Sequence, residues 1–296
     1  MREKVMFVID AAGDLSLEQI KDKPIMIVPA RVHIEGREEL FDLFGISPQE
    51  YWEVLKTCQT PPSTSMAPPL EWMAAYKRAY EQGYTHLFVT TVSSTGSGVF
   101  GAACMGVGML REEGGDGPVI ETVDSLGYSA IYGHAILRGC EMAAEGVPFA
   151  EIVQNIRDIF NRTEAVIGVY TLKYLKRSGR INGVAAFAGE ALGLRPILRA
   201  RGGSIDPCDK VRGDNKVVPA IINNMARYFN RNDSEQRVNI VCGDVPEEDI
   251  LELERLLRER FGVENPTRYI IGPSIATNTG PHCIGTIYYG EPRGVE

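Results

Sequence analysis

Histidine and closely spaced cysteine are both scarce in this sequence. There are four histidines and six cysteines among 296 residues, and no two cysteines stand in a Cys-x-x-Cys spacing. A structural zinc site needs about four such ligands close together, and a histidine-rich metal site needs several histidines. We therefore expect no metal site, and we interpret the cysteines as reduced, mostly buried thiols.

An excess of positive charge is also absent. The chain has 31 Lys and Arg against 39 Asp and Glu, which gives a formal net charge of −8. Nucleic acid and anionic membranes both attract positively charged surfaces. We therefore expect no nucleic acid among the partners of this protein.

Long apolar runs are missing as well. A transmembrane helix needs roughly 18 or more consecutive apolar residues, and no such run occurs. The apolar run Val5–Ile9 is ended by Asp10 and is too short for the core of a signal peptide. These features predict a cytoplasmic protein without stable membrane insertion.

Short apolar runs alternate with helical segments along the first half of the chain. Strands are predicted at 5–9, 25–28, 86–92 and 118–123, and helices at 70–80, 99–110, 128–144 and 149–160. This alternation is typical of a parallel sheet with right-handed crossover helices.

A second unit is predicted to begin near residue 163. It contains strands at 165–170, 238–242, 269–271 and 284–288, a hairpin around 201–203, a short basic helix in 171–181, and helices at 184–192, 214–230 and 246–261. At this length a chain usually divides its core. We therefore predict an α/β protein with an N-terminal domain at 1–163 and a C-terminal α/β domain at 164–296.

The stretch Ser93-Ser94-Thr95-Gly96-Ser97-Gly98-Val99-Phe100-Gly101 joins a predicted strand to a predicted helix. In α/β sheets ligands bind where a strand ends and a helix begins. The spacing Gly96-x-Gly98-x-x-Gly101, with Asp124 after the next strand, is compatible with a nicotinamide- or flavin-dependent enzyme. The serines instead favour a small anion such as a carboxylate, and helix capping alone would also use them.

Two further stretches and one group of arginines are candidates for a functional role. The segment 59–69 combines prolines with hydroxyl residues and is predicted to be a stiff loop. The segment 272–283 is rich in glycine, proline and polar residues, is predicted to be a loop between strands, and carries His282 as a candidate site residue. The second unit holds a cationic zone of Arg180, Arg195, Arg199, Arg201 and Arg212.

Taken together in chain order, several stretches resemble the DegV family of bacterial fatty-acid-binding proteins. Each is similar to a motif of that family: Asp10–Leu15, Val28-Pro29 with Gly36 and Asp42, Ser63–Pro68, Ser93–Gly98, Val123–Ser125 with Ser129 and Gly133, Leu172–Ile181, Leu192–Leu198, Lys210–Arg212 and Ile271–Pro281. The resemblance covers essentially the whole chain.

The resemblance implies a two-domain fold with one long-chain fatty acid in a tunnel between the domains, and no catalysis by the protein itself. In the family the carboxylate meets a threonine and a serine, which correspond to Thr64 and to Ser93 or Ser94. The ligand-binding residues expected on this basis are Thr64, Ser65, Ser93, Ser94, Ser97, Asn278, Thr279 and His282. No cofactor is expected other than the fatty acid as ligand.

Some family members present the fatty acid to a separate kinase subunit, which converts the carboxylate to an acyl phosphate. The resemblance implies that Arg212 couples the protein to such a fatty acid kinase. The sequence also departs from the family pattern, since Asn278 stands where the family has histidine and His282 follows four residues later. A lipid carrier or sensor without a kinase partner is therefore a further alternative.

Apolar residues outside these motifs are candidates for the tunnel wall. On apolarity alone we select Met73, Phe100, Met105, Ile167, Leu192 and Ile270. Burial of a sixteen-carbon chain at roughly 0.8 kcal/mol per CH₂ would contribute on the order of 10 kcal/mol before ordering costs.

Overall fold

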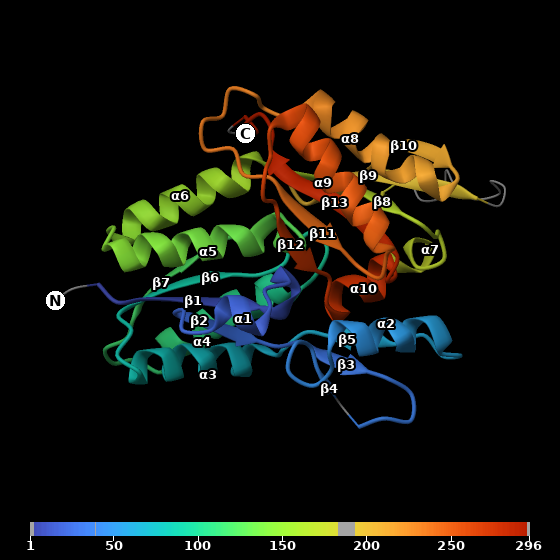
Figure 1. Cartoon of the computed structure of the whole chain (residues 1–296). Coiled ribbons are helices and arrows are strands. Elements are labelled where there is room, and N and C mark those ends of the chain that lie inside the picture. Colours follow the sequence, from blue (N-terminus) through green and yellow to red (C-terminus); the bar gives the residue numbers. More distant parts are fainter. Residues whose placement is uncertain (1–2, 39, 183–192, 295–296) are drawn as a thin grey trace.

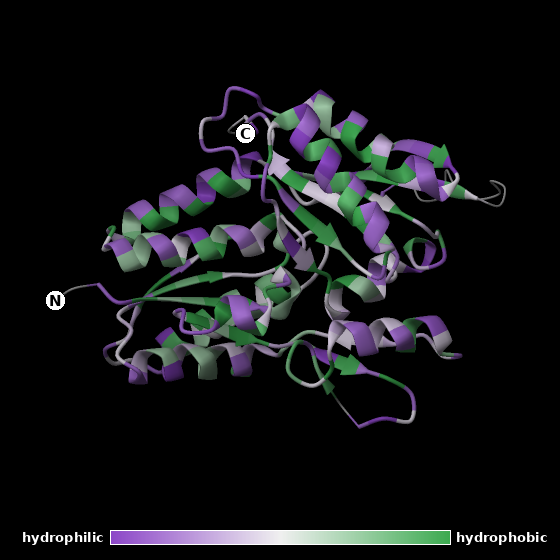
Figure 2. Cartoon of the chain, viewed as in Figure 1, coloured by the Kyte–Doolittle hydropathy of each residue, from purple (hydrophilic) through white to green (hydrophobic). Residues whose placement is uncertain are grey.

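Two separate β-sheets form the frame of the protein, and Figure 1 shows one above the other. The structure is a computed structural model that describes residues 3–38, 40–182 and 193–294. Apolar segments gather inside both halves, whereas the outer helix faces are hydrophilic (Figure 2). The predicted α/β class with a parallel first sheet is confirmed.

The first sheet is parallel throughout, as the alternation of strands and helices predicts. Its strands are β1 (Val5–Asp10), β2 (Ile25–Val28), β6 (His86–Thr90) and β7 (Val119–Thr122), in the order β2-β1-β6-β7. Helices α3 (Pro69–Glu81) and α4 (Val99–Glu112) cover one face, and α5 (Ala130–Glu145) and α6 (Phe149–Arg162) cover the other (Figure 1). The short helix α1 (Leu17–Ile20) follows β1.

A small antiparallel sheet extends from this half. It consists of β3 (Arg31–His33), β4 (Leu40–Phe41) and β5 (Ser63–Ser65), with β3 in the middle. The segment predicted as a stiff loop therefore contributes β5 as an edge strand, where the flanking prolines are tolerated. Helix α2 (Pro48–Thr57) begins at a capping box of Ser47 and Glu50.

The second sheet is mixed and has a helical layer on one face. Its strands are β8 (Thr163–Val169), β9 (Leu194–Arg201), β10 (Ser204–Arg212), β11 (Asn239–Cys242), β12 (Thr267–Ile270) and β13 (Cys283–Tyr289), in the order β10-β9-β8-β13-β11-β12. Helices α8 (Val217–Tyr228) and α9 (Glu247–Phe261) lie over its outer face (Figure 1). Two short helices, α7 (Leu175–Ser178) and α10 (Pro273–Thr279), lie at the strand ends near the first half.

The apolar core is continuous between the two sheets. One cluster joins Phe7 and Phe88 of the first sheet to Ala200 and Val241 of the second. A second cluster lies under α8 and α9. The inner face of the second sheet therefore packs toward the first half of the chain.

Two local predictions need correction, and a third falls outside the described residues. The segment 272–283 is not a loop throughout, because residues 273–279 form α10. The basic helix predicted in 171–181 is shorter, with only 175–178 helical before the left-handed Gly179. The predicted helix at 184–192, with Leu192, lies outside the described residues.

Candidate functional site

A cavity of about 330 Å³ lies between the two sheets. Its walls are mostly apolar and come from both halves of the chain, with Val28, Val92, Val99 and Ile131 on one side and Ala165, Ile167, Ala200, Val241 and Ile287 on the other. Small side chains such as Ala165 and Ala200 leave the space that larger residues would fill. A cavity of this size and character is typical of a site for an apolar small molecule.

Polar residues from four separate segments also line this cavity. They include Thr64 and Ser65 of β5, Ser97 of the turn before α4, Ser178 and Arg180 at the end of α7, and Ser274, Asn278 and Thr279 of α10. The Ser178 hydroxyl donates to Asn278 Oδ1 at 3.2 Å, and Arg180 Nε donates to the Gly96 carbonyl at 3.3 Å. These bonds bring α7, α10 and the turn together at one polar region of the cavity.

Thr64 offers a hydroxyl that is free to meet a ligand. Among the described residues no side chain or backbone group forms a hydrogen bond with it, although its backbone lies in β5 opposite Val32. The neighbouring Ser65 hydroxyl bonds to His33 Nε2 at 2.8 Å. Ser97 Oγ accepts a long bond of 3.4 Å from the Val99 amide. The sequence prediction places these three hydroxyls at the site, and the structure brings them to the cavity wall.

Asn278 and Thr279 also reach the cavity, and both are held by the helix that the sequence did not predict. Asn278 Nδ2 donates to the Ser274 carbonyl at 3.0 Å, and Thr279 Oγ1 donates to the Ile275 and Gly280 carbonyls. Asn278 keeps the ability to hydrogen-bond a ligand, but it cannot supply a charge.

Three predicted site residues do not line the cavity. Ser93 is fully buried, and its hydroxyl bonds to Thr95 Oγ1 at 2.8 Å within the turn. Ser94 is exposed, and its amide donates to Asp124 Oδ1 at 3.2 Å. His282 follows α10 and bonds through Nδ1 to the Asp244 carbonyl at 2.6 Å. Turn geometry points these groups elsewhere, so the structure does not bring them together with Thr64.

Arg180 lines the cavity although it is not among the ligand-binding residues predicted from the sequence. Among the described residues that line the cavity it carries the one positive charge. Its Nη1 donates to the Ser178 carbonyl at 2.7 Å, which fixes the guanidinium beside the polar region. The sequence signal was present, since Arg180 belongs to the cationic zone and to the stretch Leu172–Ile181.

Close packing accounts for Gly96 of the glycine-rich turn. A Cβ on Gly96 would lie 2.6 Å from the Tyr128 hydroxyl, and one on Gly98 would touch Met66. Asp124, the acid that a dinucleotide would need, accepts from the amides of Ser94 and Leu126. Both bonds end on Oδ1 of Asp124, so one oxygen of this carboxylate stabilises the turn.

Most of the apolar residues selected for the tunnel wall lie elsewhere. Ile167 lines the cavity, whereas Met105 and Ile270 are exposed on the outside of the protein. Met73 and Phe100 are partly buried but do not line the cavity. Apolarity alone does not tell which face of a helix or strand a residue occupies, which explains these errors.

Three buried carboxyl groups lie at or beside the cavity, and two of them, Asp14 and Asp42, anchor α10. Asp14 accepts from the Ser129 hydroxyl at 2.5 Å and from the Gly272 amide at 2.9 Å. Asp42 accepts from the Ser274 amide at 3.0 Å and from the Ser274 hydroxyl. These bonds join the first half of the chain to the start of α10, which carries Asn278 and Thr279.

The third of these carboxyl groups, Asp10, lines the cavity itself. Its Oδ1 accepts from the Tyr132 hydroxyl at 2.5 Å and from the Val92 amide at 3.2 Å. Burial raises the pKa of Asp10 to about 7, and it also raises the pKa values of Asp14 and Asp42. Desolvation thus disfavours the charged form of all three groups.

The part of the chain that the structure describes shows neither a metal site nor a membrane-spanning helix. Within residues 3–38, 40–182 and 193–294 no group of three or more histidine, cysteine or acidic side chains could hold a metal ion. In the same ranges every helix is too short or too polar to cross a membrane.

Known proteins with similar sequences and folds share one family. A model of the DegV family, described as uncharacterised proteins, matches residues 4–291. A DegV domain-containing protein of Caldanaerobacter subterraneus subsp. tengcongensis is 28% identical over 286 residues, which covers 97% of this chain and 99% of that protein.

Solved structures give the same result at the level of the fold. A DegV family protein of Thermus thermophilus, described as binding fatty acid, superposes with a TM-score of 0.85 at 24% identity over 97% of this chain and 100% of its own. A DegV lipid-binding protein of Thermotoga maritima has a TM-score of 0.81 at 25% identity over 98% of this chain and 99% of its own. With the family model matched from residue 4 to residue 291, the chain belongs to the DegV family.

Proposed function

We propose that this protein binds one long-chain fatty acid in the cavity between its two sheets. The observation that carries the proposal is the combination of mostly apolar walls with polar residues from β5, α7, α10 and the turn before α4 in one region. An amphipathic ligand with one polar end matches this arrangement. The lipid ligands of the Thermus and Thermotoga proteins support the same class of ligand.

The carboxylate would lie against the hydroxyls of Thr64, Ser65 and Ser97, with Asn278 and Thr279 at the same polar region. Ser97 takes the place that the sequence pattern gives to Ser93 or Ser94, because it is the serine of that turn that lines the cavity. A desolvated carboxylate needs several donors to remain ionised. Arg180 adds a permanent positive charge to these neutral donors.

The protein would act by binding and would present its ligand to a separate fatty acid kinase subunit. Arg212, the residue assigned to this coupling, is exposed at the end of β10 and does not line the cavity. It therefore stands where a partner protein can reach it. A carrier or sensor without a kinase differs from this proposal only in the absence of that partner.

A cavity-filling variant tests the binding site. We expect Ala200→Phe to abolish binding of a labelled C16 fatty acid, because Ala200 is buried in the cavity wall. Ala74→Phe is the matched control, since Ala74 is exposed on α3. Thermal unfolding shows whether both variants fold. Unchanged binding by folded Ala200→Phe would place the ligand outside this cavity.

A second experiment tests the coupling to a kinase. Arg212→Ala should slow acyl-phosphate formation by a cognate kinase subunit while the bound fatty acid is retained. Arg258→Ala, an exposed arginine of α9 that pairs with Glu264, is the control. Equal loss of lipid and of phosphorylation in Arg212→Ala contradicts the assigned role.

A further inference from the structure

A second depression, of about 560 Å³, lies at the opposite ends of strands whose other ends reach the first cavity. Val241 of β11 and Ile271 after β12 line the first cavity, whereas Asn239 and Thr267 begin the same two strands and line the second. The remaining wall comes from segments 229–238 and 261–265. The two sites share no lining residue.

Positive charge dominates the lining of this second depression. Arg231 makes no ion pair with any residue of the described ranges, and its guanidinium carbon lies 5.3 Å from the Phe261 ring centroid and 5.9 Å from that of Phe229. Contact with the rings fixes the direction of the guanidinium without neutralising it. An uncompensated arginine of fixed direction is a suitable partner for an anion.

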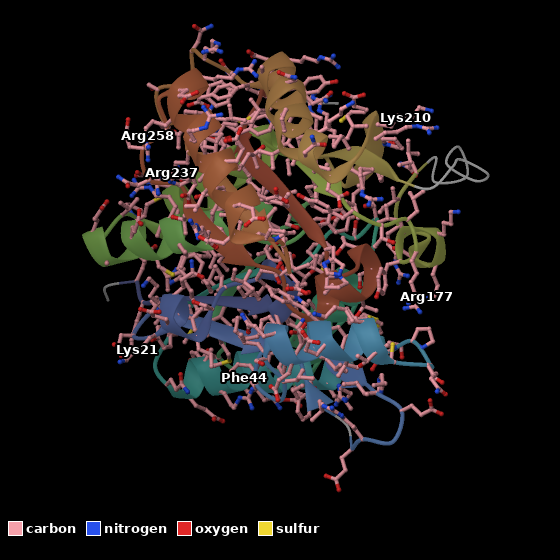
Figure 3. The ribbon with its side chains drawn as sticks, turned by 45° about the vertical axis from the view of Figure 1, so that its right-hand side comes forward. Lys21, Phe44, Arg177, Lys210, Arg237 and Arg258 are labelled. Carbon is pink, nitrogen blue, oxygen red and sulfur yellow. The ribbon has the colours of Figure 1, made fainter. Side chains whose placement is uncertain are left out.

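A second arginine lies in the same wall, and Figure 3 labels it at the edge of the molecule. Arg237 meets Glu141 only at 3.7 Å, and Glu141 is already bonded to Arg138 at 3.1 Å. Glu264 is the one acidic side chain among the described lining residues, and Arg258 pairs with it at 3.1 Å. The local charge is therefore positive, although the whole chain carries −8.

An amide that bonds to no other described residue lies at this depression. Asn239 lines the depression and makes no side-chain hydrogen bond with any residue that the structure describes. The residue is only 7% exposed, yet its amide atoms are not closed off from solvent. The amide can therefore donate a hydrogen bond to a ligand in the depression.

The wall is also braced by contacts that do not involve a ligand. Gln236 Nε2 donates to the carbonyls of Asn230 and Tyr289, and Gln236 Oε1 accepts from the Tyr289 amide. Arg162 holds Asp233 and Glu235 of the same segment at 2.8 and 2.6 Å. The two arginines are thus carried by a segment that is already ordered, which lowers the entropic cost of binding.

We propose that this depression is a binding site for the phosphate group of a small molecule or for free phosphate, held by Arg231, Arg237 and Asn239. Phosphate matches two guanidinium groups and a neutral amide donor better than an uncharged ligand does. The proposal is independent of fatty acid binding, because the site shares no residue with the first cavity.

Titration of the full chain with inorganic phosphate, followed by backbone amide chemical shifts, tests this site. We expect saturable shifts confined to residues 229–239 and 261–267. Arg231→Gln and Arg237→Gln should each weaken binding about tenfold, as the loss of a charge-assisted bond implies. Arg255→Gln is the control of equal charge change, since Arg255 pairs with Glu252 and Glu259 and does not line the site.

A parallel titration with phenyl phosphate distinguishes the two sources of the group. Tighter binding than inorganic phosphate indicates a phosphate ester, and equal or weaker binding indicates free phosphate. Absence of saturable shifts with inorganic phosphate overturns the proposal, as does an equal loss of affinity in Arg255→Gln. Fatty acid content, measured on the same samples, should stay unchanged in all three variants.

Discussion

At the scale of single residues, hydroxyls of one turn have different roles. Ser97 lines the cavity, whereas Thr95 Oγ1 donates to the Gly203 carbonyl at 2.7 Å and so joins the turn to the hairpin between β9 and β10. The Ser93 hydroxyl bonds to the Thr95 hydroxyl and accepts a hydrogen bond from the Thr95 amide. The motif therefore both shapes the site and holds the two halves of the chain together.

Thr64 gives the most direct test of the carboxylate position. Thr64→Val keeps the shape of the side chain and removes its free hydroxyl, so we expect fatty acid affinity to fall about tenfold, as for a lost hydrogen bond to a charged group. Displacement of a fluorescent fatty acid measures this. Ser94→Ala should change the affinity less than about twofold. A larger effect for Ser94→Ala than for Thr64→Val would place the carboxylate at the Ser93-Ser94 turn.

Asp10 links stability to pH. Its pKa is raised by burial from 3.8 to about 7, so the neutral form is favoured in the folded protein. The stability that this group contributes is present below the unfolded pKa near 4 and is lost as the pH rises through about 7. The increase in the pKa of Asp10 on folding corresponds to about 4 kcal/mol of unfolding free energy, which is lost at pH values above 8.

Asp10→Asn should therefore reduce the decline in stability between pH 5 and pH 8. Both hydrogen bonds to Asp10 end on Oδ1, which asparagine retains. Urea unfolding of the wild type and the variant at the two pH values measures the difference. Equal changes in stability between pH 5 and pH 8 for the wild type and Asp10→Asn would show that Asp10 is charged throughout this range.

At the scale of elements, α10 is the helix that the sequence does not predict. Glycine and proline at both ends of 272–283 predict a loop, and Pro273 at the first helical position permits a helix as well. The deciding contacts come from residues far away in the chain: Asp14 and Asp42 bond to the amides at its start, and Tyr51 bonds to Thr277 at 2.6 Å. These partners cannot be predicted from the sequence of the segment itself, because they are distant from it in the chain.

Gly280 shows how closely α10 is packed at its end. It has a φ of +80°, and a Cβ there would lie 2.3 Å from the Tyr174 ring. Gly280→Ala should therefore cost roughly 3 kcal/mol or more of unfolding free energy, because its backbone, with a ψ of 169°, lies in a region that only glycine adopts readily, and because the Cβ overlaps the ring. It should also weaken fatty acid binding, because Asn278 and Thr279 would move.

Gly262 offers a milder comparison for that variant. It also has a positive φ, of +71°, but its ψ of 21° places it in the left-handed helical region, and a Cβ there would meet nothing within 4 Å. Gly262→Ala should therefore cost only about 1–2 kcal/mol and leave fatty acid binding unchanged. Equal unfolding free energies for the two variants would mean that neither the backbone at Gly280 nor the Tyr174 ring resists an added methyl group.

At the scale of the whole molecule, regular alternation was enough to predict the parallel first sheet. The same pattern could not give the order β10-β9-β8-β13-β11-β12 of the second sheet, because that order depends on pairings between distant strands. For the candidate site, motifs far apart in the sequence predict Thr64, Ser97 and Asn278, and the structure places all three at the cavity wall. Arg180 is not among the predicted ligand-binding residues, because it comes close to them only when α7 meets the turn before α4.

The two sheets and the cavity between them lead to one central claim, that the protein carries a fatty acid. Denaturing extraction of the purified recombinant protein, followed by mass spectrometry of the released molecules, tests it most directly. We predict about one equivalent of long-chain fatty acid in the wild type and far less in Ala200→Phe, with Ala74→Phe unchanged. A nucleotide cofactor in the extract together with the absence of fatty acid would contradict the account.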